Sequence, residues 1–201
     1  MSEQLAPQRD VNVPEEFTQE ILGWVSWLEP VAEADLTEEQ YEAMIQRGRA
    51  KQEYFRLLAH DPAVLLHRTR ADFDIFFNKA AGLPRADREI AAAAASRLNG
   101  CVYCASVHAR FASHHAKRTD DVQRLLDDGV SARTDARWDA IVDATVALTE
   151  TPSAFDESTL DALADAGLGD DEVYDVILAG GFFNWANRLM LTLGEPELPQ
   201  K

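Results

Sequence analysis

The sequence predicts an all-α protein, a multi-helix bundle. Apolar residues recur every three or four positions along most of the chain, and Pro and Gly fall between these stretches. No run alternates apolar and polar residues for long enough to indicate a strand. With 201 residues, 46% of them hydrophobic, the chain is long enough to bury a substantial core. Helices are expected at residues 14–29, 37–59, 61–82, 84–99, 101–117, 119–127, 135–149, 155–166 and 170–193.

Start signals justify the first three helices. An apolar face follows Pro14 and ends before Pro30, which predicts a short helix between them. Thr37 and Gln40 have the spacing of a capping box, so a helix should start there and run to about residue 59. The Asp61-Pro62 pair places an N-cap before a proline, and this helix should stop at residue 82.

The later helices are bounded by prolines and glycines. Pro84 opens one helix and Asn99-Gly100 closes it, because glycine suits the left-handed backbone at a helix end. Gly129 closes the short helix 119–127, while residues 135–149 and 170–193 are helical by their apolar period. The five consecutive alanines Ala91–Ala95 predict the closest helix packing in the core.

No linker divides the chain sharply. Residues 1–35 are expected to be an N-terminal extension that is partly helical, with residues 1–13 loosely ordered. Residues 36–195 should form the helical domain, and residues 196–201 a C-terminal tail.

The charge of the chain bears on its partners. A net charge of −16 repels nucleic acid phosphates and anionic lipid, so neither is expected as a partner. No signal peptide and no apolar run of about 20 residues is visible, which predicts a cytoplasmic protein without membrane contact. Because structural disulfides tend to be reduced in the cytosol, a pair of cysteines there is better explained as a working dithiol.

Cys101 and Cys104 are the only cysteines, and His108 follows four residues later. On a helix, positions three and four apart are neighbours, so these three side chains share one face. If the chain reverses at Asn99-Gly100, Glu89 reaches the height of His108. The expected order is therefore a carboxylate that holds an imidazole, which can take the proton of the Cys104 thiol.

This set of residues allows other interpretations. Two small cysteines can simply pack in a core. Cys101, Cys104 and His108 could also bind zinc with His114 or His115, although structural zinc sites usually take two separated ligand pairs and only one is visible. Redox chemistry, which needs no metal or organic cofactor, is the favoured interpretation.

The motif Glu89, Cys101-Val102-Tyr103-Cys104 and His108 resembles the alkylhydroperoxidase D-like proteins of the carboxymuconolactone decarboxylase superfamily. The peroxidase-related proteins of that superfamily are similar in their Tyr before the second Cys and in a late segment, here Phe183-Asn184-Trp185-Ala186-Asn187-Arg188. The resemblance spans roughly residues 60–195 and implies an all-helical homo-oligomer.

The resemblance implies roles for the site residues. Cys104 would be the cysteine that attacks a hydroperoxide, Cys101 would close the disulfide, and Glu89 and His108 would relay the proton. An external thiol or dithiol would then reduce the disulfide. The best-studied hydroperoxidases of the family have a His where this chain has Tyr103, a weak base that could still position the substrate.

Two further hypotheses remain open. One is a decarboxylase or lactone-processing enzyme that uses Glu89 and His108 for acid–base chemistry. The other is a non-enzymatic oligomeric redox sensor. The remaining polar and aromatic candidates are read as structural or interface residues: His60, His67, Asn184, Asn187, Arg188, Trp24, Trp27, Trp138 and Trp185.

Overall fold

A computed structural model describes residues 10–80 and 82–199. The fold class is confirmed, because nine α-helices and one two-stranded sheet make up the regular structure of the described residues. Their α-helices are α1 (Glu38–Ala43), α2 (Glu53–Leu58), α3 (Pro62–Phe77), α4 (Arg85–Leu98), α5 (Val102–Ala116), α6 (Thr119–Asp127), α7 (Ala136–Thr149), α8 (Glu157–Asp165) and α9 (Asp170–Leu193). The 3-10 helices are η1 (Glu33–Asp35) and η2 (Arg47–Lys51), and the strands are β1 (Gly23–Ser26) and β2 (Gly194–Glu197).

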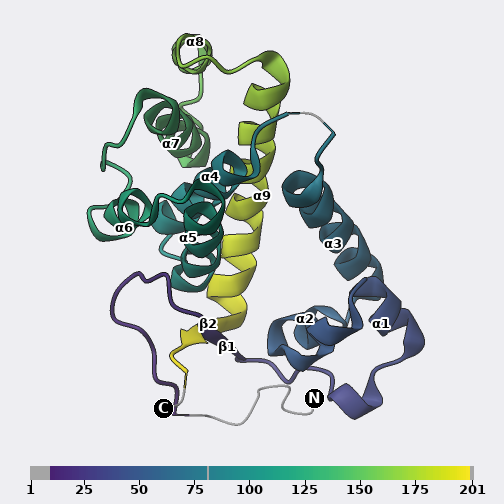
Figure 1. The fold of residues 1–201 in the computed structure, drawn as a ribbon. Coiled ribbons are helices and arrows are strands. Elements are labelled where there is room, and N and C mark those ends of the chain that lie inside the picture. Colours follow the sequence, from purple (N-terminus) through teal and green to yellow (C-terminus); the bar gives the residue numbers. More distant parts are fainter. Residues whose placement is uncertain (1–9, 81, 200–201) are drawn as a thin grey trace.

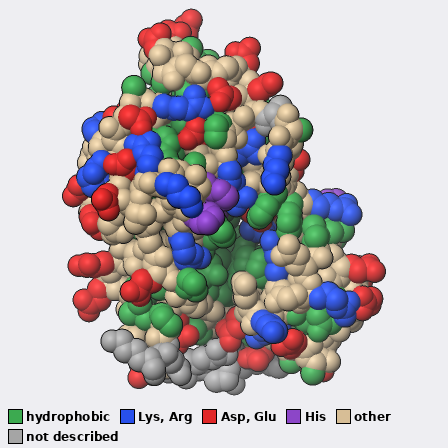
Figure 2. Space-filling model, in the orientation of Figure 1, with side chains coloured by type: hydrophobic (Ala, Val, Ile, Leu, Met, Phe, Trp, Pro, Cys, Tyr) green, Lys and Arg blue, Asp and Glu red, His purple; other side chains and the backbone are tan. Residues whose placement is uncertain are grey.

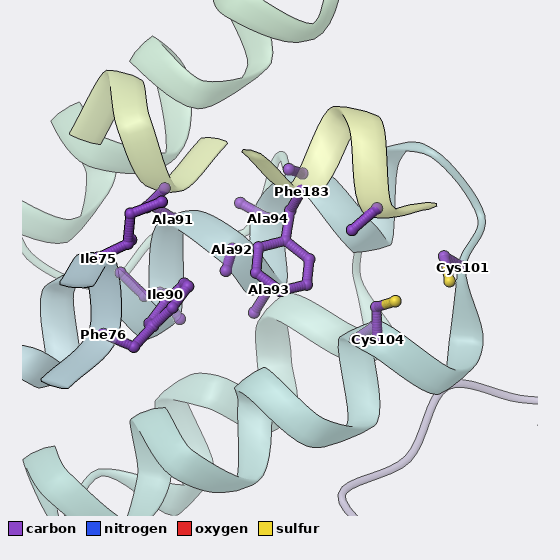
Figure 3. Packing of buried hydrophobic residues seen from close by; sticks show 14 of the residues in the cluster. Ile75, Phe76, Ile90, Ala91, Ala92, Ala93, Ala94, Cys101, Cys104 and Phe183 are labelled. Atoms are coloured by element: carbon purple, nitrogen blue, oxygen red, sulfur yellow. The ribbon is translucent and has the colours of Figure 1, made fainter. Parts of the chain in front are cut away.

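Helix α4 lies at the centre of the bundle. It packs against α5, α9 and α7 and also contacts α3 and α6, while α1 to α3 lie on the other side of the long helix α9 (Figure 1). All five residues of Ala91–Ala95 are completely buried, as their small size predicts. Phe183 of α9 reaches towards these alanines (Figure 3). The alanine run therefore allows α5 and α9 to approach α4 closely.

The expectation that the chain has no strand is wrong. β1 pairs antiparallel with β2, with Trp24 opposite Pro196 and Ser26 opposite Gly194. A Cβ atom on Gly194 would lie 2.2 Å from the carbonyl oxygen of Val25, so only glycine permits this approach. The two strands lie at opposite ends of the sequence, and local periodicity cannot reveal such a pairing. β2 also crosses the expected boundary between residues 195 and 196.

Two expected helices in the N-terminal part are also wrong. Residues 14–29 form no helix, because the apolar residues Trp24 and Val25 are buried by strand pairing instead. The expected helix 37–59 does begin with the capping box of Thr37, but it is divided into α1, η2 and α2. Ile45 adopts a left-handed backbone with φ +63°, which turns the chain after α1. The expectation for residues 1–13 falls mostly outside the described residues.

The later helices have bounds close to those expected from the sequence. α6 and α9 have the expected bounds, and α4, α5, α7 and α8 differ by one or two residues at their ends. α3 ends at Phe77, five residues before the expected stop. None of the described helices has the length and apolarity needed to cross a membrane.

Candidate active site

The turn between α4 and α5 brings the predicted site residues together. Asn99 caps the end of α4, Gly100 has a left-handed backbone with φ +79°, and Cys101 occupies the N-cap of α5. The two helices are then antiparallel neighbours, as the Asn-Gly signal predicts. Glu89 on α4 and His108 on α5 consequently lie side by side.

Glu89 is completely buried and holds two cationic or polar partners. One oxygen, Oε2, lies 2.5 Å from Nδ1 of His108, and the other, Oε1, accepts a hydrogen bond of 2.5 Å from Nε of Arg85. Arg85 itself is fixed by a hydrogen bond of 2.6 Å to the carbonyl of Phe76 and by stacking on Phe77. A carboxylate only accepts hydrogen bonds, so Nδ1 of His108 carries its hydrogen and Nε2 is left as a base.

Two aromatic rings fix the imidazole of His108. Its ring centroid lies 3.9 Å from that of Phe183 in an edge-to-face arrangement and 5.2 Å from that of Phe76. Cys104 precedes His108 by one helical turn on the same face of α5. Glu89 and His108 are thus paired as expected, and Cys104 lies one helical turn from His108 on the same face of α5.

Both cysteines are buried and unoxidised. The thiol of Cys104 hydrogen-bonds to the sulfur of Cys101, and this bond lowers the pKa of Cys101 although burial opposes the shift. The same bond, together with burial, raises the pKa of Cys104 well above its usual value. The sulfur at the start of α5 is therefore the more easily ionised of the two, as its place at a helix N-terminus favours.

Asn187 is a site residue that the sequence interpretation placed among structural residues. It is completely buried on α9, donates a hydrogen bond of 3.0 Å to Ser96 and accepts one of 3.1 Å from Asn99. Hydrogen bonding by Asn187 also lowers the pKa of both Cys101 and Cys104. The late Phe-Asn-x-x-Asn-Arg segment was the only signal for it. Asn184 is one turn away and bonds to Asn99 and to Thr149 on α7.

A cavity of about 710 Å³ opens beside the thiol. Cys104, His108, Glu89 and Tyr103 line it, whereas Cys101 is not among its lining residues. Figure 2 shows this side of the molecule hollowed, with a hydrophobic floor and Lys or Arg side chains around it. A molecule in this cavity would therefore reach Cys104 before Cys101.

Much of the cavity wall comes from parts of the chain that sequence reasoning left without a role. β1 contributes Trp24, the region around η2 and α2 contributes Arg49 and Tyr54, and α3 contributes Arg68 and Asp72. These residues form no local motif, since their only shared property is their position around the cavity. Residues 21–25 of the expected N-terminal extension are thus part of the cavity wall.

Tyr103 and the remaining histidines have distinct surroundings. Burial raises the pKa of Tyr103 to about 12, so its phenol stays protonated and can donate a hydrogen bond into the cavity. His114 and His115 lie exposed at the end of α5. No group of three His, Cys, Asp or Glu side chains in residues 10–80 and 82–199 is arranged to hold a metal ion, so the zinc interpretation lacks its ligand set there.

The tryptophans and His60, which were expected to be structural or interface residues, differ in burial and contacts. Trp24 and Trp138 belong to the core, while Trp27 and Trp185 are 46% and 40% exposed. Nε2 of His60, just after α2, lies 2.9 Å from the carbonyl oxygen of Glu29.

Comparisons with known proteins agree with this architecture. Residues 62–150 match the model of the Carboxymuconolactone decarboxylase family, and these residues include the whole Glu-Cys-Cys-His set. No curated protein matches the chain. Among solved structures, an uncharacterised peroxidase-related protein from Ralstonia eutropha, with an alkylhydroperoxidase AhpD core, is 21% identical with a TM-score of 0.72. That match covers 84% of this chain and 90% of the other.

Two further structures have the same fold. An uncharacterised peroxidase-related protein from Silicibacter sp. is 22% identical, with a TM-score of 0.67 and coverage of 80% of this chain and 85% of the other. A debrominase is 16% identical, with a TM-score of 0.63 and coverage of 81% and 87%. The coverage exceeds what residues 60–201 could supply, so the likeness includes chain before residue 60. The family-model match over residues 62–150, the motif and the shared fold together support the resemblance of this chain to the carboxymuconolactone decarboxylase and alkylhydroperoxidase D superfamily.

Proposed function

We propose that this protein is a thiol-dependent peroxidase that reduces an organic hydroperoxide with the Cys101–Cys104 pair. The observation that carries the proposal is that Cys104 lines a cavity of about 710 Å³ together with the His108–Glu89 pair. A nucleophile, a base and a carboxylate that orients the base are the parts that activated-thiol chemistry requires. The two peroxidase-related neighbours share the fold and so support this direction.

In the first step Nε2 of His108 takes the proton of the Cys104 thiol. The sulfur attacks the terminal oxygen of the hydroperoxide, a sulfur–oxygen bond forms and the oxygen–oxygen bond breaks. The leaving alkoxide takes the proton from His108 and departs as an alcohol, while Cys104 becomes a sulfenic acid. Glu89 holds the imidazole in the tautomer that this transfer needs and stabilises its cationic form.

In the second step the sulfur of Cys101 attacks the sulfur of the sulfenic acid. A disulfide forms, the sulfur–oxygen bond breaks, and hydroxide leaves as water after it takes a proton. The lowered pKa of Cys101 suits this role, because the attacking sulfur must be a thiolate. An external thiol or dithiol then supplies two electrons to regenerate the pair.

The pKa directions alone would assign the first attack to Cys101. Access argues for Cys104, since Cys101 is 2% exposed and lies outside the cavity wall. Attack requires contact between sulfur and peroxide, and we therefore assign the first attack to Cys104, which lines the cavity. Tyr103 lies next to Cys104 on the cavity wall, where its phenol can hydrogen-bond to a peroxide oxygen.

The partners and setting follow from the same proposal. The protein would act in the cytoplasm as a homo-oligomer, for which the exposed Trp27 and Trp185 offer apolar contact surface. A mass that changes between reduced and oxidised protein would instead favour the redox sensor. The debrominase among the neighbours is a reminder that one fold supports several reactions.

The experiment is a free-thiol count on reduced protein before and after one equivalent of cumene hydroperoxide, followed by addition of a dithiol. The proposal requires loss of both thiols, release of one equivalent of alcohol, and recovery of both thiols with the dithiol. Thiols that persist while the protein remains folded would refute it. Turnover of a lactone by the Cys101→Ser, Cys104→Ser double variant would support the decarboxylase class instead.

A further inference from the structure

The far wall of the cavity holds two arginines that share one carboxylate. Nη2 of Arg49 lies 3.8 Å from Oδ2 of Asp72, and Nη1 of Arg68 lies 3.4 Å from the same oxygen. The three side chains are only 14%, 8% and 15% exposed. Charge-assisted hydrogen bonds are usually about 2.7–2.9 Å long, so Asp72 satisfies neither guanidinium fully.

Several donors of these arginines are buried without a hydrogen-bond partner. They are Nη1 of Arg49 and both Nε and Nη1 of Arg68. A buried donor with no partner costs about 1–3 kcal/mol, and more when it is charged, so such donors in a cavity wall indicate a missing acceptor. Arg49 and Arg68 are both among the residues that line the same cavity as Cys104.

The charge around the cavity differs from that of the whole chain. Within the described residues its wall holds five cations and four carboxylates, although the protein has 35 acidic and 19 basic residues. Arg85 is already bonded to Glu89, and Arg110 donates to a backbone carbonyl. The cluster of Arg49, Arg68 and Asp72 carries one net positive charge, which a single carboxylate would neutralise.

The rest of the wall is apolar and aromatic. Trp24, Phe55, Phe76, Phe183 and Met190 all contribute to it. A cavity of about 710 Å³ is within the usual range for sites that enclose a small organic molecule. The positive charge of Arg68 lowers the pKa of the Cys104 thiol, against the larger effects that raise it. The two arginines and the sulfur therefore belong to one site.

We propose that Arg49 and Arg68 bind the carboxylate of an amphiphilic substrate, an apolar organic hydroperoxide with a single carboxylate, and so hold its hydroperoxide group towards Cys104. Guanidinium groups suit this task because their fork of N–H donors matches a carboxylate and they stay charged when buried. The hydroperoxide part of this assignment rests on the proposed function, whereas the carboxylate site does not.

The first test is equilibrium binding of decanoate, an unreactive carboxylate, followed by the fluorescence of the cavity-lining Trp24 and by calorimetry. Decanamide is the neutral probe of the same length. We expect decanoate to bind at least about tenfold more tightly than decanamide, the size expected for a hydrogen bond to a charged group. Equal affinity for the two probes, or no binding of decanoate, would overturn the carboxylate site.

Matched variants locate the effect. Arg68→Met and Arg49→Met should each reduce the preference for decanoate by about tenfold. Arg70→Met and Arg47→Met are the matched controls, because neither residue lines the cavity. Arg70 follows Arg68 by two residues on α3, and Arg47 lies in η2 with its side chain 61% exposed. These two controls should bind decanoate like the wild type. Arg68→Lys keeps the charge and should retain part of the preference, which separates charge from packing.

A second measurement separates this proposal from the proposed function. Single-turnover thiol loss is compared for a carboxylated fatty hydroperoxide and its methyl ester in the wild type and in Arg68→Met. Faster reaction of the acid than of the ester, abolished in Arg68→Met, supports both proposals. Reaction without preference for the acid overturns the carboxylate site alone. Decanoate binding with no reaction of either hydroperoxide overturns the peroxidase function alone.

Discussion

Replacing Glu89 by Gln keeps the shape of the side chain and removes its charge. Oε1 of the Gln can still accept from Arg85, so its amide group faces Nδ1 of His108. An amide N–H only donates, and the imidazole must then place its hydrogen on Nε2. His108 would lose the free nitrogen that takes the Cys104 proton, and loss of such a general base costs about 10²–10⁴ in rate.

The same change also lowers stability by an amount that the structure defines. Glu89 makes hydrogen bonds to Arg85 and to His108, and both are assisted by charge. A hydrogen bond to a charged group contributes about 1.5–3 kcal/mol and a neutral one about 0.5–1.5 kcal/mol. The bond from Arg85 keeps its charged donor, so only the bond to His108 becomes neutral, and the change costs about 1–1.5 kcal/mol. Urea unfolding measures this loss in the free energy of unfolding separately from the reaction rate.

The assay is single-turnover thiol loss after mixing with a hydroperoxide, under conditions where the variant is fully folded. Glu38→Gln is the control, because Glu38 also pairs with an arginine but its side chain is 68% exposed. That change should leave the rate unaltered and alter stability by no more than about 0.5 kcal/mol. A folded Glu89→Gln variant that reacts at the wild-type rate would refute the relay.

Three further predictions concern the surroundings of the site. Asn187→Ala removes hydrogen bonding that lowers the pKa of Cys101, so the ultraviolet absorbance of its thiolate should appear at a higher pH than in the wild type. An unchanged titration would remove Asn187 from the site. Gly100→Ala places a Cβ on a left-handed backbone and should cost about 1–2 kcal/mol in urea unfolding, whereas Gly48→Ala, at a position with open space, should be nearly neutral. Burial of Glu172 is outweighed by hydrogen bonds from the backbone and from an arginine on α7, which hold its pKa below its usual 4.5. The contribution of Glu172 to stability is present above pH 4.5 and is lost as the pH falls through the lower folded-state pKa. Between pH 6 and pH 3, roughly the window of this titration, Glu172→Gln should therefore lose less stability than the wild type. Equal losses would contradict the assignment.

The helices that carry the candidate site residues were the easiest to predict. Pro84, Asn99 and Gly100 mark the ends of α4 with local signals, and the helix period then places Cys104 and His108 on one face. Their proximity to Glu89 follows from a single turn between consecutive helices. Short-range rules were therefore sufficient for the thiol, the imidazole and the carboxylate.

The cavity wall could not be predicted in this way. Trp24 enters it because β1 pairs with β2, which lies at the other end of the sequence. Arg49 and Arg68 enter it because the left-handed Ile45 breaks an expected helix and folds η2 back onto α3. Each of these contacts depends on tertiary structure, and no pattern within one segment encodes it.

The central claim is that Cys104 is the sulfur that meets the substrate. Its most direct test is to treat Cys101→Ser and Cys104→Ser with one equivalent of organic hydroperoxide and dimedone, and to locate the trapped sulfenic acid by peptide mass spectrometry. The account predicts rapid modification of Cys104 in Cys101→Ser and little modification of Cys101 in Cys104→Ser. Rapid modification of Cys101 with Cys104 unreactive would show that ionisation, and not access from the cavity, selects the attacking sulfur.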